Sequence, residues 1–136
     1  MPQVSRNKPH PDIGRRMFEL LYKALAEAKK EKEVRDLLQD LITPTERVML
    51  AKRLAIAVLL AKGYDYRQTS FILKVSYGTI GRVVASIRLS GVGFTRFIRN
   101  LAKYEGFLSL MEDVDRFLVK AAFPNRRLPE KKQPVL

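Results

Sequence analysis

The 136-residue chain has no cysteine and a single histidine, His10. Without cysteine it can form no disulfide, and it offers neither a thiolate metal ligand nor a thiol nucleophile. This absence is compatible with a reducing cytoplasm. His10 lies between two prolines in a basic segment, where we expect it to be solvated. The sequence contains no carboxylate pair, metal-ligand cluster or phosphate-binding glycine loop that would indicate catalysis. We therefore predict that the protein is not an enzyme and uses no metal or cofactor.

Long apolar segments are also missing. The longest unbroken apolar run, Leu54 to Ala61, has eight residues, and about 20 are needed to span a bilayer. The first ten residues, MPQVSRNKPH, lack the apolar stretch of a signal peptide. We therefore expect a cytoplasmic protein without a membrane partner.

Acidic residues are scarce relative to basic ones. The chain has 26 Lys and Arg against 14 Asp and Glu, a net charge of +12. Residues 63–104 hold seven basic side chains and one acidic side chain, so half of the excess lies in this segment. A concentrated basic segment favours a polyanionic partner, most often nucleic acid. The alternative is a solvated surface that only maintains solubility.

Apolar residues recur at helical spacing along most of the chain, and no segment shows the alternation of a strand. The sequence thus predicts an all-α fold. Leu54 to Ala61 is apolar around the whole helix, so it must be covered on every side. We expect a second copy of the chain to cover it in an intertwined homodimer; a single-chain bundle is the alternative. The predicted parts are a flexible basic arm (1–12), a helical dimerisation core (13–62), a helix-turn-helix (63–90), C-terminal helices (91–123) and a disordered basic tail (124–136).

The helix-turn-helix is predicted from two capped helices separated by a short turn. Asp65 and Ser76 are suitable N-caps, and Lys74 occupies the turn position that glycine usually takes. The second helix contains Gly78 and Gly81, and each costs about 1 kcal/mol relative to alanine in a helix interior. A surface that lies close against DNA bases would explain these glycines. Close packing between helices inside the protein is the alternative.

The stretch DLITPTERVMLAKRLAIAVLLAKG, followed by YRQTSFILKVSYGTIGRV, resembles the Trp repressor family. The resemblance implies a DNA-binding transcriptional regulator, built as an intertwined all-helical dimer that binds duplex DNA. Together with the charge and the outward face of the second helix, it gives these candidate DNA contacts: Tyr66, Arg67, Ser70, Lys74, Tyr77, Gly78, Gly81, Arg82 and Arg88. In members that bind a corepressor, the pocket corresponds to Thr43, Arg53, Thr79, Arg82 and Ser86.

One position departs from the tryptophan-binding members, because Val83 stands where they have glycine. Its branched side chain would fill space that glycine leaves open. We therefore expect a repressor that binds DNA without tryptophan, and a small-molecule corepressor is possible but not favoured. Two alternatives stay open: a repressor that depends on tryptophan or another small ligand, and a non-specific nucleic-acid-binding protein acting on RNA or the nucleoid.

Overall fold

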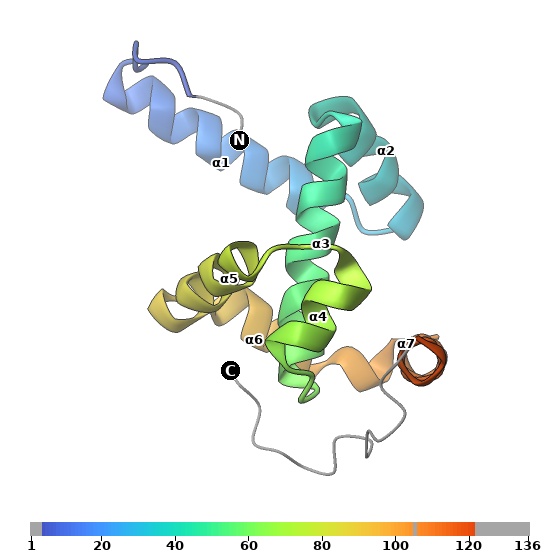
Figure 1. Ribbon diagram of the computed structural model, residues 1–136. Helices are drawn as coiled ribbons and strands as arrows, with labels where there is room; N and C mark the ends of the chain where they lie inside the picture. Colours follow the sequence, from blue (N-terminus) through green and yellow to red (C-terminus); the bar gives the residue numbers. More distant parts are fainter. Residues whose placement is uncertain (1–3, 105, 122–136) are drawn as a thin grey trace. The chain divides into compact units, whose positions relative to one another are not determined.

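A computed structural model describes residues 4–104 and 106–121, and every regular element among them is helical. The predicted all-α fold is confirmed for this part of the chain. The chain divides into two compact units, residues 1–47 and 48–136 (Figure 1). The tail predicted at 124–136 lies outside the described residues.

The first unit contains α1 (Pro11–Glu27), α2 (Glu31–Leu41) and the beginning of α3 (Pro44–Ala61). The start of α1 corrects the sequence analysis, which placed an arm over residues 1–12. Pro11 lies at the first helical position, where a missing N–H and a fixed φ suit a helix. The Nδ1 atom of His10 accepts a hydrogen bond from the Asp12 backbone N–H at 3.3 Å. His10 is therefore an N-cap.

The start of α3 follows the sequence pattern. The Thr43 backbone N–H donates to Glu46 Oε2 at 2.7 Å, and the Glu46 backbone N–H donates to Thr43 Oγ1 at 3.2 Å. Hydrogen bonding from the Thr43 backbone N–H, and to a smaller extent from the Thr43 hydroxyl, holds the pKa of the Glu46 carboxyl below its ordinary value. Thr43 and Glu46 thus form the reciprocal cap that a threonine followed three residues later by glutamate favours.

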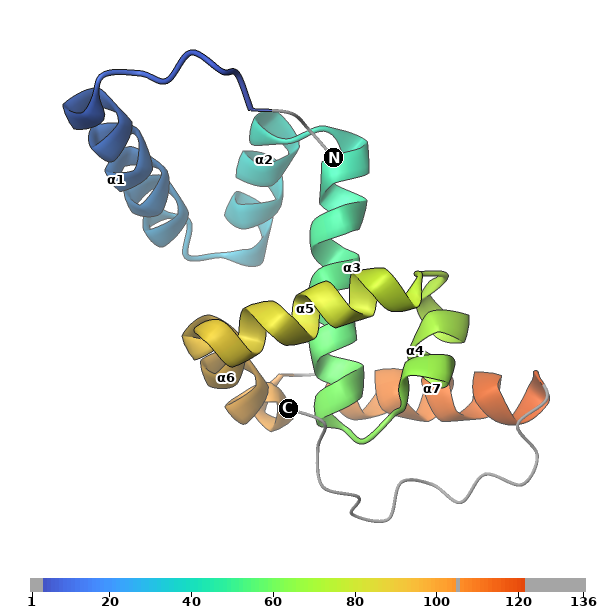
Figure 2. The ribbon, with the colours of Figure 1, turned by 60° about the vertical axis from the view of Figure 1, so that its left-hand side comes forward.

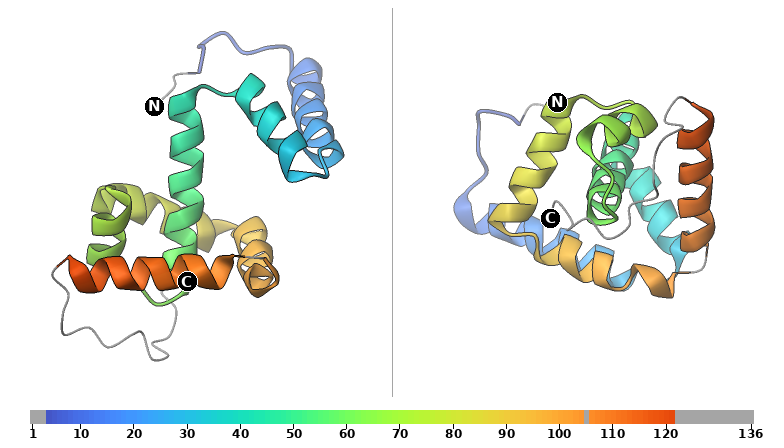
Figure 3. Two further views of the ribbon diagram at one scale, coloured as in Figure 1. Left: turned by 90° about the vertical axis from the view of Figure 1, so that its right-hand side faces the viewer. Right: turned by 60° about the horizontal axis from the view of Figure 1, so that its bottom comes forward.

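The second unit is built around the rest of α3. It contains α4 (Tyr66–Leu73), α5 (Tyr77–Leu89), α6 (Val92–Arg99), the short 3₁₀ helix η1 (Leu101–Lys103) and α7 (Phe107–Lys120). Figure 2 shows α5 crossing α3, with α4 next to the turn that precedes α5. Figure 3 shows α7 passing the C-terminal end of α3.

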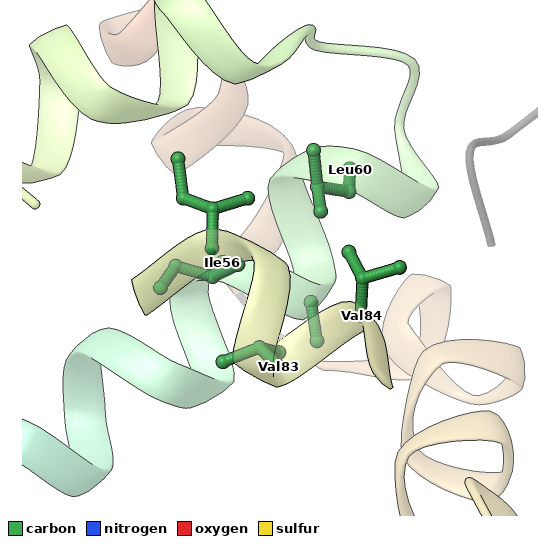
Figure 4. Packing of buried hydrophobic residues seen from close by; sticks show 6 residues of the cluster. Ile56, Leu60, Val83 and Val84 are labelled. Carbon is green, nitrogen blue, oxygen red and sulfur yellow. The ribbon is translucent and has the colours of Figure 1, made fainter. Parts of the chain in front are cut away.

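Residues Ile56 to Leu60 of α3 form the centre of this unit, and all five are buried within a single chain. Three apolar clusters surround them. Ile56 and Leu60 pack against Val83 and Val84 of α5 (Figure 4). Val58 packs against η1 and the start of α7, and Leu59 packs against the end of α7.

The expectation that a second copy covers Leu54 to Ala61 is therefore wrong for most of that run, and the single-chain alternative holds for Ile56 to Leu60. Helices α4 to α7 supply the cover. Leu54, which precedes the buried residues, is still 38% exposed.

The turn between α5 and α6 depends on one glycine. Gly91 has φ +61°, and a Cβ atom added there would lie 2.3 Å from the Ile87 carbonyl oxygen. No other residue type fits without moving backbone. This turn sends α6 back against α3, where Phe94 and Ile98 join the cluster around Ile56.

Candidate nucleic-acid interface

Helix α4 begins at a reciprocal cap, as its sequence predicts. The Gln68 backbone N–H donates to Asp65 Oδ1 at 2.8 Å, and the Asp65 backbone N–H donates to Gln68 Oε1 at 3.0 Å. Gln68 is buried and Asp65 is exposed, so the cap is partly shielded from solvent. The two reciprocal hydrogen bonds give this eight-residue helix a defined start.

A three-residue turn joins α4 to α5. Lys74 adopts the left-handed conformation (φ 54°, ψ 54°), as predicted for the position that glycine usually takes. Ser70 Oγ donates to the Val75 carbonyl oxygen at 2.7 Å, and the Thr79 backbone N–H donates to Ser76 Oγ at 3.1 Å. The two helices are therefore joined by hydrogen bonds on both sides of the turn.

The inward face of α5 is packed and its outward face is open. Ile80, Val83 and Val84 are buried against α3. Tyr77, on the outward face, is 54% exposed. The same face also carries the exposed residues Gly78, Arg82, Ala85 and Arg88 and the partly exposed Gly81.

Gly78 and Gly81 are not required by packing inside the chain. A Cβ atom added at Gly81 meets nothing within 4 Å, and one added at Gly78 meets only Ser76 Oγ, at 3.7 Å. The alternative that these glycines permit close helix packing therefore has no support within one chain. Their open surface is available to a molecule outside it.

Aromatic and cationic side chains flank this open surface. The rings of Tyr66 and Tyr77 meet edge to face at 6.1 Å, so one aromatic pair joins α4 to α5. Lys74 Nζ lies 4.3 Å from the centre of the Phe71 ring. None of the ion pairs among the described residues involves Lys74, Arg82 or Arg88. No carboxylate in the described part of the chain neutralises their charges.

Two predicted DNA contacts lie on α4, and the first of them, Ser70, is constrained by a hydrogen bond. The Ser70 hydroxyl already donates to Val75, so donation to a phosphate would require it to leave the turn. Arg67 is exposed at the first turn of α4. Both lie on the helix that precedes the turn, beside the open surface of α5.

The five predicted ligand residues belong to two units of the structure, Thr43 to the first and the other four to the second. Arg53, Arg82 and Ser86 are exposed, and Thr79 Oγ1 lies 3.1 Å from Ser76 Oγ. Ser86 lines an open hollow with Leu54 and residues 90–94 and 97, whose lining includes none of the other four.

Val83, the departure from the tryptophan-binding pattern, is 5% exposed. Its side chain packs with Ile56, Ala57 and Leu60 (Figure 4). Val83 thus contributes to the packing of α5 against α3, and its side chain occupies space between these two helices.

The sequence analysis missed the contacts of α7 with α4. Phe117 lies against Phe71, with ring centres 5.7 Å apart, and Tyr64 Oη donates to Asp115 Oδ1. Apolar spacing predicted C-terminal helices over residues 91–123, but nothing local to them indicated which helix they would contact.

Two features of other functional classes are absent from the described part of the chain. No group of three His, Cys, Asp or Glu side chains there could hold a metal ion. No described helix combines the length and apolarity required to cross a membrane.

The chain is similar to a known protein family. The family described as Trp repressor protein matches residues 16–102, well over half of the chain. The match includes α2 to α6 and most of α1, and it ends before α7. No curated protein and no solved structure matches the chain.

Proposed function

The chain belongs to the Trp repressor family of DNA-binding regulators, and we propose that it is a dimeric repressor that reads duplex DNA with the outward face of α5. The open surface at Gly81 carries this proposal. The glycine costs about 1 kcal/mol of helix stability, and no neighbouring group among residues 4–104 and 106–121 uses the space it leaves. A base edge or thymine methyl in the major groove would use it.

The flanking residues suit the two kinds of contact that such a helix makes. Tyr77 and Arg82 border the glycines and can reach base edges or phosphates. Tyr66, Arg67 and Lys74 lie on α4 and the turn, where a crossing backbone would pass in this docking mode. Arg88 lies farther along α5 and would contact phosphate. The basic excess of residues 63–104 would then attract DNA at long range.

Exposed apolar surface supports the dimer. No residue of α1 or α2 is buried, although α1 carries an apolar stripe that includes Ile13, Met17 and Leu21. In the second unit, α3, α4, α6, η1 and α7 line an apolar groove of about 560 Å³, which Leu54 helps to form. A second copy of the chain would cover such surfaces.

A dimer would present two copies of α5 about one turn of DNA apart, ~34 Å, and would favour a palindromic site. A folded monomer at micromolar concentration in sedimentation would contradict the dimer. A selected site without two-fold symmetry would do the same.

Buried Val83 supports binding without tryptophan. A corepressor acts only by binding the DNA-competent state more tightly than other states. Because Val83 already fastens α5 to α3, a ligand would have little order left to add. The exposed Arg53 and Arg82 are then available as surface cations.

The test is selection of bound sequences from random duplex DNA, followed by competition of duplex DNA and RNA at physiological salt. We expect a shared sequence among the selected duplexes and weak competition by RNA. Gly81→Glu should abolish this specific binding without unfolding the protein, because the added carboxylate would face DNA. Equal competition by RNA would favour the non-specific nucleic-acid-binding alternative.

A further inference from the structure

Helix α7 lies outside the family match, yet it is tightly packed in the second unit. Leu118 is 1% exposed and forms a buried cluster with Leu59 of α3 and Tyr64. Tyr64 Oη also donates to Asp115 Oδ1. These contacts attach α7 to the segment that leads directly into α4.

A second group of contacts reaches α4 itself. The Phe117 ring lies 5.7 Å from the Phe71 ring, and Met111 and Val114 pack against the same cluster as Ile72. Figure 2 shows α7 crossing near the end of α4, and α4 contacts both α7 and α5. Helix α4 is therefore held between α5 and α7.

The stack continues to the turn of the proposed DNA-binding motif. Phe71 has Phe117 against its ring, and the same ring lies 4.3 Å from Lys74 Nζ. Phe71 thus links Phe117 of α7 to Lys74, a cation that we propose contacts DNA. Lys74 Nζ would change position if Phe71 moved.

Helix α4 depends on such support because it has only eight residues. Isolated helices shorter than about 12 residues are marginal in water, so their order comes from packing. We propose that Phe117 and Leu118 of α7 are positioning residues that hold α4, and through Phe71 the cation of Lys74, in the DNA-binding arrangement. This proposal rests on the proposed function. In it, packing of α7 against α4 orders the helix-turn-helix, a role that a bound corepressor would otherwise have.

The test compares full-length variants by DNA affinity and by hydrogen exchange of α4. Phe117→Ala is the main variant because Phe117 is 47% exposed, and its truncation should leave the protein folded. Phe117→Leu restores apolar volume and should recover binding. Leu108→Ala is the matched control, since Leu108 is an exposed apolar residue on the same helix. Leu118→Ala is a stronger change, used only where circular dichroism shows that it folds.

We expect Phe117→Ala to weaken binding to a selected duplex at least about fivefold at a temperature where circular dichroism shows the protein fully folded. Amides of α4 should exchange faster, while those of α3 and α5 should not. Leu108→Ala should change neither quantity. Wild-type affinity and unchanged α4 exchange in Phe117→Ala would overturn the proposal.

The two readouts separate this proposal from the proposed function. If the wild-type chain selects no duplex, the proposed function fails, and α4 exchange alone decides whether α7 holds this helix. Faster exchange with unchanged affinity would show that α7 stabilises α4 without positioning its DNA contacts, which overturns the positioning role.

Discussion

Gly81→Ala should have opposite effects on stability and on DNA binding. Gly81 is the fifth residue of α5, and an added Cβ meets nothing within 4 Å. Replacing glycine by alanine in a helix interior contributes about 0.8–1.0 kcal/mol. With no clash to offset this gain, the melting temperature should rise by about 2–6 °C for a chain of this size.

The same methyl group should weaken DNA binding. An added methyl in a close-packed contact costs about 1–3 kcal/mol, which corresponds to a roughly 5- to 150-fold higher Kd. Thermal unfolding measures the first effect, and titration of a labelled, selected duplex measures the second. Because the variant is the more stable protein, a loss of affinity cannot come from unfolding.

Gly93→Ala is the matched control. Gly93 lies in α6, outside the proposed reading surface, and an added Cβ there also meets nothing within 4 Å. This variant should gain stability and keep wild-type affinity. If Gly81→Ala binds as tightly as the wild type, the small-residue face does not read DNA. If Gly81→Ala is less stable than the wild type, the glycine packs against a second copy of the chain.

Three further predictions follow from the turn, the ligand residues and the α3 cap. Lys74→Gly removes a non-glycine residue from the left-handed conformation, which stabilises the fold by about 1–2 kcal/mol. It also loses the contact with Phe71 and raises the entropy of the unfolded chain, and each of these costs about 0.5–1 kcal/mol. The free energy of unfolding should therefore stay within about 1 kcal/mol of the wild-type value, while the slope of log affinity against log salt concentration should fall by about 1 in magnitude. Tryptophan at ~1 mM should leave the affinity for the selected duplex unchanged. A tenfold gain in affinity, ~1.4 kcal/mol of coupling, would instead support a tryptophan-dependent repressor. Because the pKa of Glu46 is lowered in the folded protein, its carboxylate stabilises the fold at pH values above the ordinary pKa of 4.5, and this contribution is lost as pH falls through the folded pKa. The melting temperature should therefore fall less between neutral and acid pH in Glu46→Gln than in the wild type. Equal falls in the two proteins would contradict this role.

The features that could be predicted from sequence are those decided within a few residues. The caps at Thr43, Asp65 and Ser76 each join residues three positions apart, so the pattern alone identifies them. The left-handed turn at Lys74 is equally local, because it follows from the spacing of two helices. The outward face of α5 follows from helical periodicity, and the structure places its residues as expected.

The contacts that could not be predicted join distant parts of the chain. Tyr64 and Asp115 are 51 positions apart, and no local pattern pairs them. Phe117 could be assigned to an apolar helix face, but that face had several possible partners. The contact of α7 with α4, on which the support of the motif depends, therefore required the structure.

The apolar run of α3 shows how a correct inference about burial can name the wrong partner. A helix that is apolar on every side must be covered, and Ile56 to Leu60 are indeed buried. Periodicity does not say which segments supply the cover, and here helices from the same chain do so. The case for a second copy therefore moves to surfaces that remain exposed, the apolar stripe of α1 and the groove beside Leu54. The groove has no α5 residue in its lining, so a dimer formed through the groove would leave the small-residue face of α5 free for DNA.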